Sequence, residues 1–241
     1  MSASVARMRS WPTSPPTRRD EILEESIGLP YPNTSFLDVS SAIIGFAIVL
    51  VSLTIHEAAH AWTADRLGDP TARLLGRVSL NPVVHIDPIG TLLLPLLSAI
   101  SNLPLIGWAK PVPVNISRLR HHRRDFMIVA AAGPASNLAQ AVLAAMIFRT
   151  LRGADVDAAL TMGVLDRAVE INLLLAFFNL LPIPPLDGGN VLAGLLPESA
   201  AAVLNWIRQF GVILLYALML TGVLAQLILP PTRFFWELLL W

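Results

Sequence analysis

The sequence contains no cysteine. This absence excludes disulfide bonds and thiolate ligands, so a transition metal would have to be held by histidine, aspartate or glutamate. Charged residues make up only 14% of the 241 residues, whereas soluble domains contain about 25%. The formal net charge is +0, and no basic tract carries interleaved aromatic residues, which argues against a nucleic-acid-binding protein. With 54% hydrophobic residues, the composition is typical of a polytopic membrane protein.

The beginning of the chain has no apolar segment. Residues 1–38 contain scattered arginines, a proline-rich stretch at 11–16 and an acidic run at 20–25. A secretory signal would need an apolar core in this region, and the first apolar run starts only at about Ala42. The pattern predicts a mostly disordered tail, with a short surface helix over 20–29 as the alternative.

Long apolar runs dominate the rest of the chain. A helix needs about 20 apolar residues to span a bilayer, and four segments meet this length: 41–64, 126–149, 164–183 and 207–229. A fifth apolar segment, 89–107, is interrupted by prolines and polar residues, so it could be a kinked span or a re-entrant hairpin. The sequence therefore predicts an all-α polytopic membrane protein with about five to six transmembrane or re-entrant helices.

Positive charges in the loops indicate how these segments are oriented. The strongest basic cluster lies at 110–124, and the loop after the first helix carries three arginines, so both loops are expected on the cytoplasmic side. Segment 89–107 would then begin and end on the same side, which favours the hairpin. The first helix and helix 164–183 would end at the same face. The arginines of the tail conflict with this orientation, but they are distant from the first helix.

Two short segments have the character of strands. Residues 77–85 alternate partly between apolar and polar side chains, and residues 112–115 form a second extended piece. Their prolines suit an edge strand. They predict a small membrane-associated β element whose free edge could pair with an unfolded substrate, with plain connecting loops as the alternative.

One pentapeptide carries clear chemistry. Residues 56–60 read His-Glu-Ala-Ala-His at the end of the first apolar segment. Residues four apart share one face of a helix, so His56 and His60 can hold one zinc ion, with Glu57 beside them as a general base. The alternative is a pair of packed histidines, but ionisable side chains inside a span are costly and usually functional. The motif therefore predicts a hydrolytic metal site at membrane depth.

A catalytic zinc takes three protein ligands and keeps a position open for water. Asp187 is the strongest candidate for the third ligand, because prolines end the preceding helix and two glycines allow a tight turn. A carboxylate buried there is costly unless it is paired or bound to metal. It could instead cap a helix that starts near Gly188. The other candidates are His85, Asp87, His121 and His122.

Five segments, taken in order, carry a family resemblance. They are the pentapeptide at 56–60, Leu-Asn-Pro-Val-Val-His-Ile-Asp-Pro-Ile-Gly-Thr at 80–91, Gly-Trp-Ala-Lys-Pro-Val-Pro-Val-Asn at 107–115, Ala-Gly-Pro-Ala-Ser-Asn at 132–137, and Asn-Leu-Leu-Pro-Ile-Pro-Pro-Leu-Asp-Gly-Gly at 179–189. Together they resemble the site-2 protease family of intramembrane zinc metalloproteases. The match looks like the compact bacterial branch, since no loop is long enough for an inserted PDZ domain.

The resemblance implies a role for each motif residue. His56, His60 and Asp187 would bind one Zn²⁺ per chain, Glu57 would be the catalytic acid and base, and Asn179 would assist catalysis. Residues expected to support the ligands or to bind substrate are His85, Asn81, Asn115 and Asn137. The domains would be a disordered tail at 1–38, a protease core at 39–190, and a C-terminal transmembrane helix with its anchor at 191–241.

The implied function is hydrolysis of peptide bonds within or near transmembrane segments. Its partners would be a transmembrane protein or signal-peptide substrate and membrane lipid, without nucleic acid. The expected location is a bacterial inner membrane, with the active site toward the cytoplasm. The alternative is a non-proteolytic zinc-binding scaffold or transporter, but a transporter should show polar residues along several helices, whereas here they cluster at one level.

Overall fold

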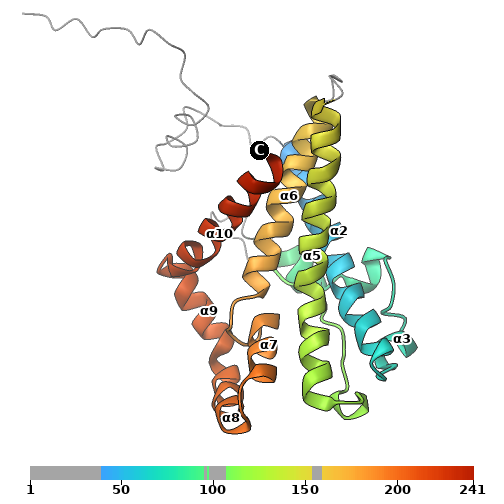
Figure 1. The fold of residues 1–241 in the computed structure, drawn as a ribbon, viewed down its shortest axis with the longest axis vertical. Helices are drawn as coiled ribbons and strands as arrows, with labels where there is room; N and C mark the ends of the chain where they lie inside the picture. The colour runs from blue at the N-terminus through green and yellow to red at the C-terminus, as the bar shows by residue number, and fades with distance from the viewer. Residues whose placement is uncertain (1–38, 95–96, 98–106, 154–158) are drawn as a thin grey trace, which may run out of the picture. The chain divides into compact units, whose positions relative to one another are not determined.

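The computed structural model describes residues 39–94, 97, 107–153 and 159–241, so the predicted tail at 1–38 lies outside them. Within these ranges every regular element is helical, which confirms the all-α prediction (Figure 1). Residues from Ser40 to Trp241 belong to one compact unit.

The first described helix, α2 (Val39–Arg66), contains the predicted span 41–64. At 1.5 Å per residue its 28 residues reach about 42 Å, which exceeds the bilayer core. Its N-terminal half exposes apolar side chains such as Ile43 and Val51, whereas its C-terminal half buries polar ones such as Thr54 and His60. The helix therefore has a face suited to lipid at one end and an internal polar face at the other.

Helices α5 (His122–Gly153) and α6 (Ala159–Asn179) lie side by side and form the centre of the unit (Figure 1). Small side chains of α5 allow the close approach. The core between α5, α6 and the C-terminal helix α10 (Val223–Leu240) consists of Ala141, Ala144, Ala145, Phe148, Val169, Leu173 and Leu240.

Four helices in the described ranges are long and apolar enough to cross a membrane: Ser41–Arg66, His122–Gly153, Glu198–Leu220 and Val223–Leu240. The protein is therefore an integral membrane protein. The predicted span 164–183 corresponds to α6, which is not among the four, because it carries the charged residues Asp166, Arg167 and Glu170. The predicted number of five to six spans is not confirmed.

The C-terminal part differs from the sequence prediction, which placed one helix at 207–229. Its elements are α7 (Asp187–Leu195), α8 (Glu198–Ile207), η4 (Arg208–Phe210), α9 (Gly211–Leu220) and α10. Gly222, with φ at 75°, separates α9 from α10. A residue with positive φ ends a helix, and glycine adopts this conformation without steric cost. The prediction of one continuous helix was therefore wrong.

The predicted β element is not formed in the described ranges. Within 77–85, the residues Pro82–His85 make a 3₁₀-helix, and residues 107–115 have no regular secondary structure. The two pieces do lie together, because the N–H of Lys110 donates to the carbonyl of His85 at 2.9 Å. Pro111 and Pro113 have no N–H to continue a ladder, so this pairing stays a single backbone bond.

Candidate metal centre

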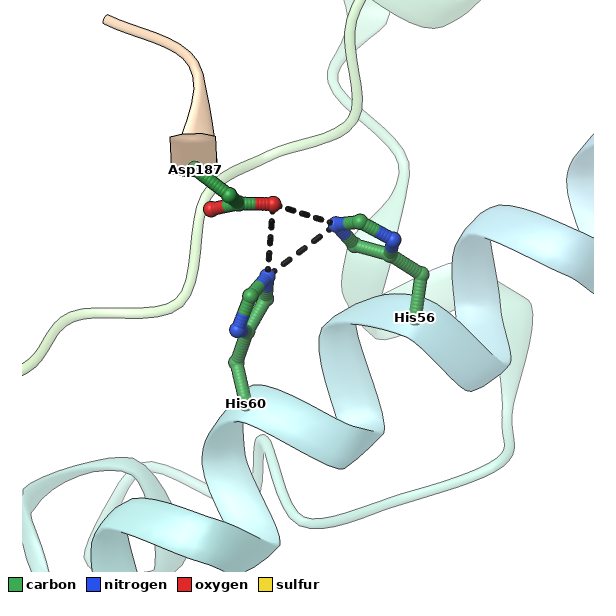
Figure 2. A group of neighbouring side chains, drawn as sticks. All are labelled: His56, His60 and Asp187. Atoms are coloured by element: carbon green, nitrogen blue, oxygen red, sulfur yellow. Dashed lines mark hydrogen bonds and ion pairs between the residues drawn. The ribbon is translucent and has the colours of Figure 1, made fainter. Parts of the chain in front are cut away.

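His56 and His60 project from successive turns of α2, and Asp187 is the first residue of α7 (Figure 2). The Nε2 atoms of the two histidines are 3.0 Å apart. Oδ2 of Asp187 is 3.1 Å from Nε2 of His56 and 3.3 Å from Nε2 of His60. In the described part of the chain, these three residues are the group that could hold a metal ion.

The separations fit a tetrahedral zinc ion. Ligand atoms about 2.0–2.1 Å from zinc lie about 3.3 Å from one another in tetrahedral geometry. The donor set of two imidazoles and one carboxylate is also one that catalytic zinc sites use, and it leaves a fourth position for water.

The outer nitrogens of both histidines are engaged. Nδ1 of His60 lies 2.7 Å from the carbonyl of Val129, and Nδ1 of His56 lies 2.6 Å from Oδ1 of Asn137. A carbonyl oxygen only accepts, so each Nδ1 carries the proton and each Nε2 presents a lone pair. Three lone-pair atoms then face one another without a hydrogen between them, an arrangement that a cation would stabilise.

Asn137 is itself fixed by a second buried asparagine. Its Nδ2 donates to Oδ1 of Asn172 at 3.0 Å, and Nδ2 of Asn172 donates to the carbonyl of Ala168 at 2.9 Å. Because Nδ2 of Asn137 faces Asn172, Oδ1 of Asn137 faces His56 and accepts the hydrogen bond from its Nδ1. The chain of bonds links α6 through α5 to the imidazole on α2.

Gly133 on α5 lies directly against the two imidazoles. A Cβ atom at this position would lie 2.3 Å from Nε2 of His60 and 2.5 Å from Nε2 of His56. Val129, Gly133 and Asn137 follow one another at intervals of four residues, so they share one face of α5. This face receives both histidines, and its central residue has to be glycine for the imidazoles to fit.

A tight loop brings Asp187 to the histidines. A Cβ atom on Gly188 would lie 2.3 Å from the carbonyl oxygen of Leu180, and one on Gly189 would lie 2.6 Å from the nitrogen of Pro184. Both glycines are therefore required by packing. Oδ2 of Asp187 faces Nε2 of His56 at 3.1 Å and Nε2 of His60 at 3.3 Å, and a carboxylate binds metal in its ionised form.

Glu57 lies beside this group and has one further contact. Its Oε2 accepts a hydrogen bond from the backbone N–H of Val112 at 3.0 Å. Val112 belongs to the extended segment 107–115, which follows 55 residues later in the chain.

The other predicted residues occupy different places. Nδ2 of Asn179 donates to the carbonyl of Leu175 in its own helix at 2.9 Å. His85 is buried, and its Nε2 bonds to the carbonyl of Ser79 at 2.8 Å, so it fixes its loop. The side chains of Asn81, Asp87 and Asn115 cap the short helices η1 (Pro82–His85), η2 (Pro88–Leu93) and η3 (Ile116–Arg118).

Two contributors to the site were not predicted from the sequence: the side chain of Asn172 and the backbone amide of Val112. The signal for Asn172 was present, because a polar residue inside an apolar helix usually has a partner. No comparable signal exists for a backbone amide.

Comparisons with known proteins identify the family of the chain. The model of peptidase family M50 matches residues 156–220. The protein "Putative zinc metalloprotease YwhC" of Bacillus subtilis is 36% identical over 188 residues, which cover 76% of this chain and 82% of the relative. The chain belongs to peptidase family M50, the site-2 protease family.

Two further M50 relatives carry the name "Putative zinc metalloprotease Rip2". The protein of Mycolicibacterium smegmatis is 33% identical over 195 residues, covering 80% of this chain and 70% of the relative. The protein of Mycobacterium tuberculosis H37Rv is 36% identical over 176 residues, which cover 73% of this chain and 66% of the relative. No solved structure matches the chain significantly.

Proposed function

We propose that this M50 peptidase is an intramembrane zinc metalloprotease whose single Zn²⁺ is held by His56, His60 and Asp187. The observation that carries the proposal is the cluster of three ligand atoms within 3.3 Å of one another. Family membership supports zinc and peptide hydrolysis. The four apolar helices support a substrate that is itself a membrane protein.

The residues around the ligands divide the chemistry among them. Zinc, when bound, lowers the pKa of a coordinated water and polarises the scissile carbonyl. Glu57 accepts the proton of the attacking water and delivers it to the leaving amine. Asn179, at the end of α6, is proposed to donate a hydrogen bond to the developing oxyanion or to the substrate backbone. The substrate helix has to unwind locally, because a closed helix shields its carbonyls.

Replacing Glu57 with glutamine tests the proposed function. The variant keeps the three metal ligands but loses the base, so cleavage is expected to fall by at least about 100-fold while zinc remains bound. The measurement is cleavage of a panel of single-span membrane proteins by purified protein in detergent, with zinc counted per chain. Chelation should also abolish cleavage by the wild type. Equal cleavage by the wild type and by Glu57→Gln would exclude Glu57 as the base. Zinc binding without any cleavage by the wild type would favour a non-proteolytic zinc-binding scaffold or transporter.

Asn137 is proposed to orient His56 for metal binding. Asn137→Leu has similar volume but no acceptor for Nδ1, so the zinc affinity is expected to fall about 10- to 100-fold, as for other outer partners of metal-bound histidines. Asn137→Asp keeps an acceptor and should retain most of the affinity. Zinc dissociation constants from chelator competition measure the effect. Unchanged affinity in the leucine variant would show that His56 needs no partner.

The placement in the membrane is also a proposal: a bacterial inner membrane, with the metal toward the cytoplasm. The two ends of segment 89–107 support the hairpin on which this topology depends. The N–H of Trp108 donates to the carbonyl of Gly90 at 3.1 Å, and the hydroxyl of Thr91 donates to the carbonyl of Trp108 at 2.8 Å. Ends that meet in this way support the proposal that the segment returns to its starting side. Residues 95–96 and 98–106 lie outside the described ranges.

The substrates are proposed to be transmembrane proteins or remnant signal peptides. The domain boundaries are proposed to be those predicted from the sequence, with the protease core at 39–190. The carbonyl of His85 accepts a hydrogen bond from the N–H of Lys110, and Asn115 ends the segment 107–115. With Asn81, these residues are proposed to support the segment as a binding edge for the unwound substrate. Pairing with backbone groups of this edge would hold an extended substrate beside the metal.

A further inference from the structure

The segment 107–115 is hydrogen-bonded to the pentapeptide at Glu57. The backbone N–H of Val112 donates to Oε2 of Glu57 at 3.0 Å. Among the described residues this bond engages Oε2 of the carboxylate and leaves Oε1 for other contacts. A base side chain is thus held at one oxygen by the main chain of a distant loop.

The local sequence leaves only this N–H to make the contact. Val112 stands between Pro111 and Pro113, so it supplies the single backbone N–H among these three residues. A residue that precedes proline is pushed into extended conformation, and this applies to both Lys110 and Val112. The Pro-Val-Pro sequence therefore presents one donor on a stiff, extended backbone.

Buried groups from the loop after α2 fix both ends of this backbone. At one end, Nη2 of the buried Arg77 donates to the carbonyl of Lys110 at 2.5 Å. At the other end, the N–H of Asn115 donates to Oδ2 of Asp69 at 2.6 Å. Asp69 is fully buried and is also bonded by the N–H and hydroxyl of Thr71. The position of Val112 is thus set by the protein itself.

We infer that the Val112 amide is a positioning group for the general base: it anchors Oε2 of Glu57 so that Oε1 faces the attacking water. The inference rests on the proposed function, since it concerns the base of that reaction. A glutamate side chain has several rotatable bonds and loses rotamer entropy when it is held in one orientation. A hydrogen bond to an ionised acceptor is stronger than a neutral one and keeps the side chain in place before substrate arrives.

A measurement without substrate tests the contact. Because residues 111 and 113 are prolines, hydrogen exchange of the Val112 amide can be followed without neighbouring amide signals. Exchange in Glu57→Ala is expected to be about 10-fold faster than in wild type, and Glu57→Gln, which keeps an acceptor oxygen, should stay close to wild type. Equal rates in the wild type and the alanine variant would overturn the inference.

Kinetics test the consequence for the reaction. Val112→Pro removes the N–H and is expected to lower kcat about 10-fold or more relative to Val112→Ala, which keeps the N–H, with little difference in KM between the two variants. An ester bond in place of the 112 amide removes only the N–H and should reproduce the proline result if the backbone is undisturbed. Zinc content near one per chain shows that each variant is folded.

The outcomes separate the two proposals. Cleavage by the wild type that depends on Glu57 but is unaffected by the ester at 112 would overturn the positioning role and leave the proposed function intact. Absence of any Glu57-dependent cleavage would overturn the proposed function, and the positioning role with it.

Discussion

Asp187→Asn is expected to remove zinc from the protein and to abolish its proteolytic activity. Asparagine has the shape of aspartate, but its neutral amide oxygen is a much weaker ligand than a carboxylate. Loss of an outer partner already costs about 10- to 100-fold in metal affinity, so loss of a direct ligand should cost more than 100-fold. In the described ranges no further His, Asp or Glu joins His56, His60 and Asp187 to take its place.

Asp166→Asn in α6 is the matched control. Its carboxylate accepts a hydrogen bond from Nε1 of Trp236 at 2.9 Å and is not part of the metal group. An amide oxygen can still accept this bond, so zinc content and activity should be unchanged. Metal analysis of both purified variants, followed by the cleavage assay, gives the comparison. Full zinc occupancy in Asp187→Asn would show that the third ligand is another residue.

Local rules explain why the metal group could be predicted from the sequence. His56 and His60 are four residues apart on a helix, so their proximity follows from helix geometry alone. Asp187 could be proposed because a carboxylate between helix-ending prolines and two glycines needs a partner. The structure brings all three together. The resemblance to the site-2 protease family supplied the same assignment independently, and family membership is confirmed by the M50 relatives.

Contacts between helices could not be predicted in the same way. The bond between His56 and Asn137 joins residues 81 apart, and that between Asn137 and Asn172 joins residues 35 apart. Which faces meet depends on how α2, α5 and α6 rotate and pack, and the sequence alone does not determine that rotation. The helix at 207–229 was mispredicted for a simpler reason: its mostly apolar composition gave no weight to Gly222, which separates α9 from α10.

The β element shows a further limit of pattern reading. Residues 112–115 have no regular secondary structure, although the sequence indicated an extended piece, and a chain becomes a strand only through a ladder of backbone bonds. Here the N–H groups of Val112 and Asn115 bond to side-chain carboxylates. These two N–H groups are thereby committed to Glu57 and Asp69 and do not pair with a neighbouring strand.

Gly133→Ala is expected to be as damaging as loss of a ligand, although glycine offers the metal no donor. The added methyl carbon would lie 2.3 Å from Nε2 of His60 and 2.5 Å from Nε2 of His56, distances that real carbon atoms do not reach. The imidazoles cannot swing aside freely, because Val129 and Asn137 hold their Nδ1 atoms from the same helix. The methyl group must therefore displace either α5 or the histidines.

The control is Gly163→Ala in α6, where a Cβ atom meets nothing within 4 Å. Alanine is favoured over glycine in a helix by about 1 kcal/mol, so this change should be neutral or slightly stabilising. Zinc per chain and thermal unfolding of both variants distinguish the effects: loss of zinc and activity for Gly133→Ala, wild-type zinc for Gly163→Ala. Normal zinc affinity in Gly133→Ala would mean that α5 can move away from α2, and that the histidines do not depend on its close approach.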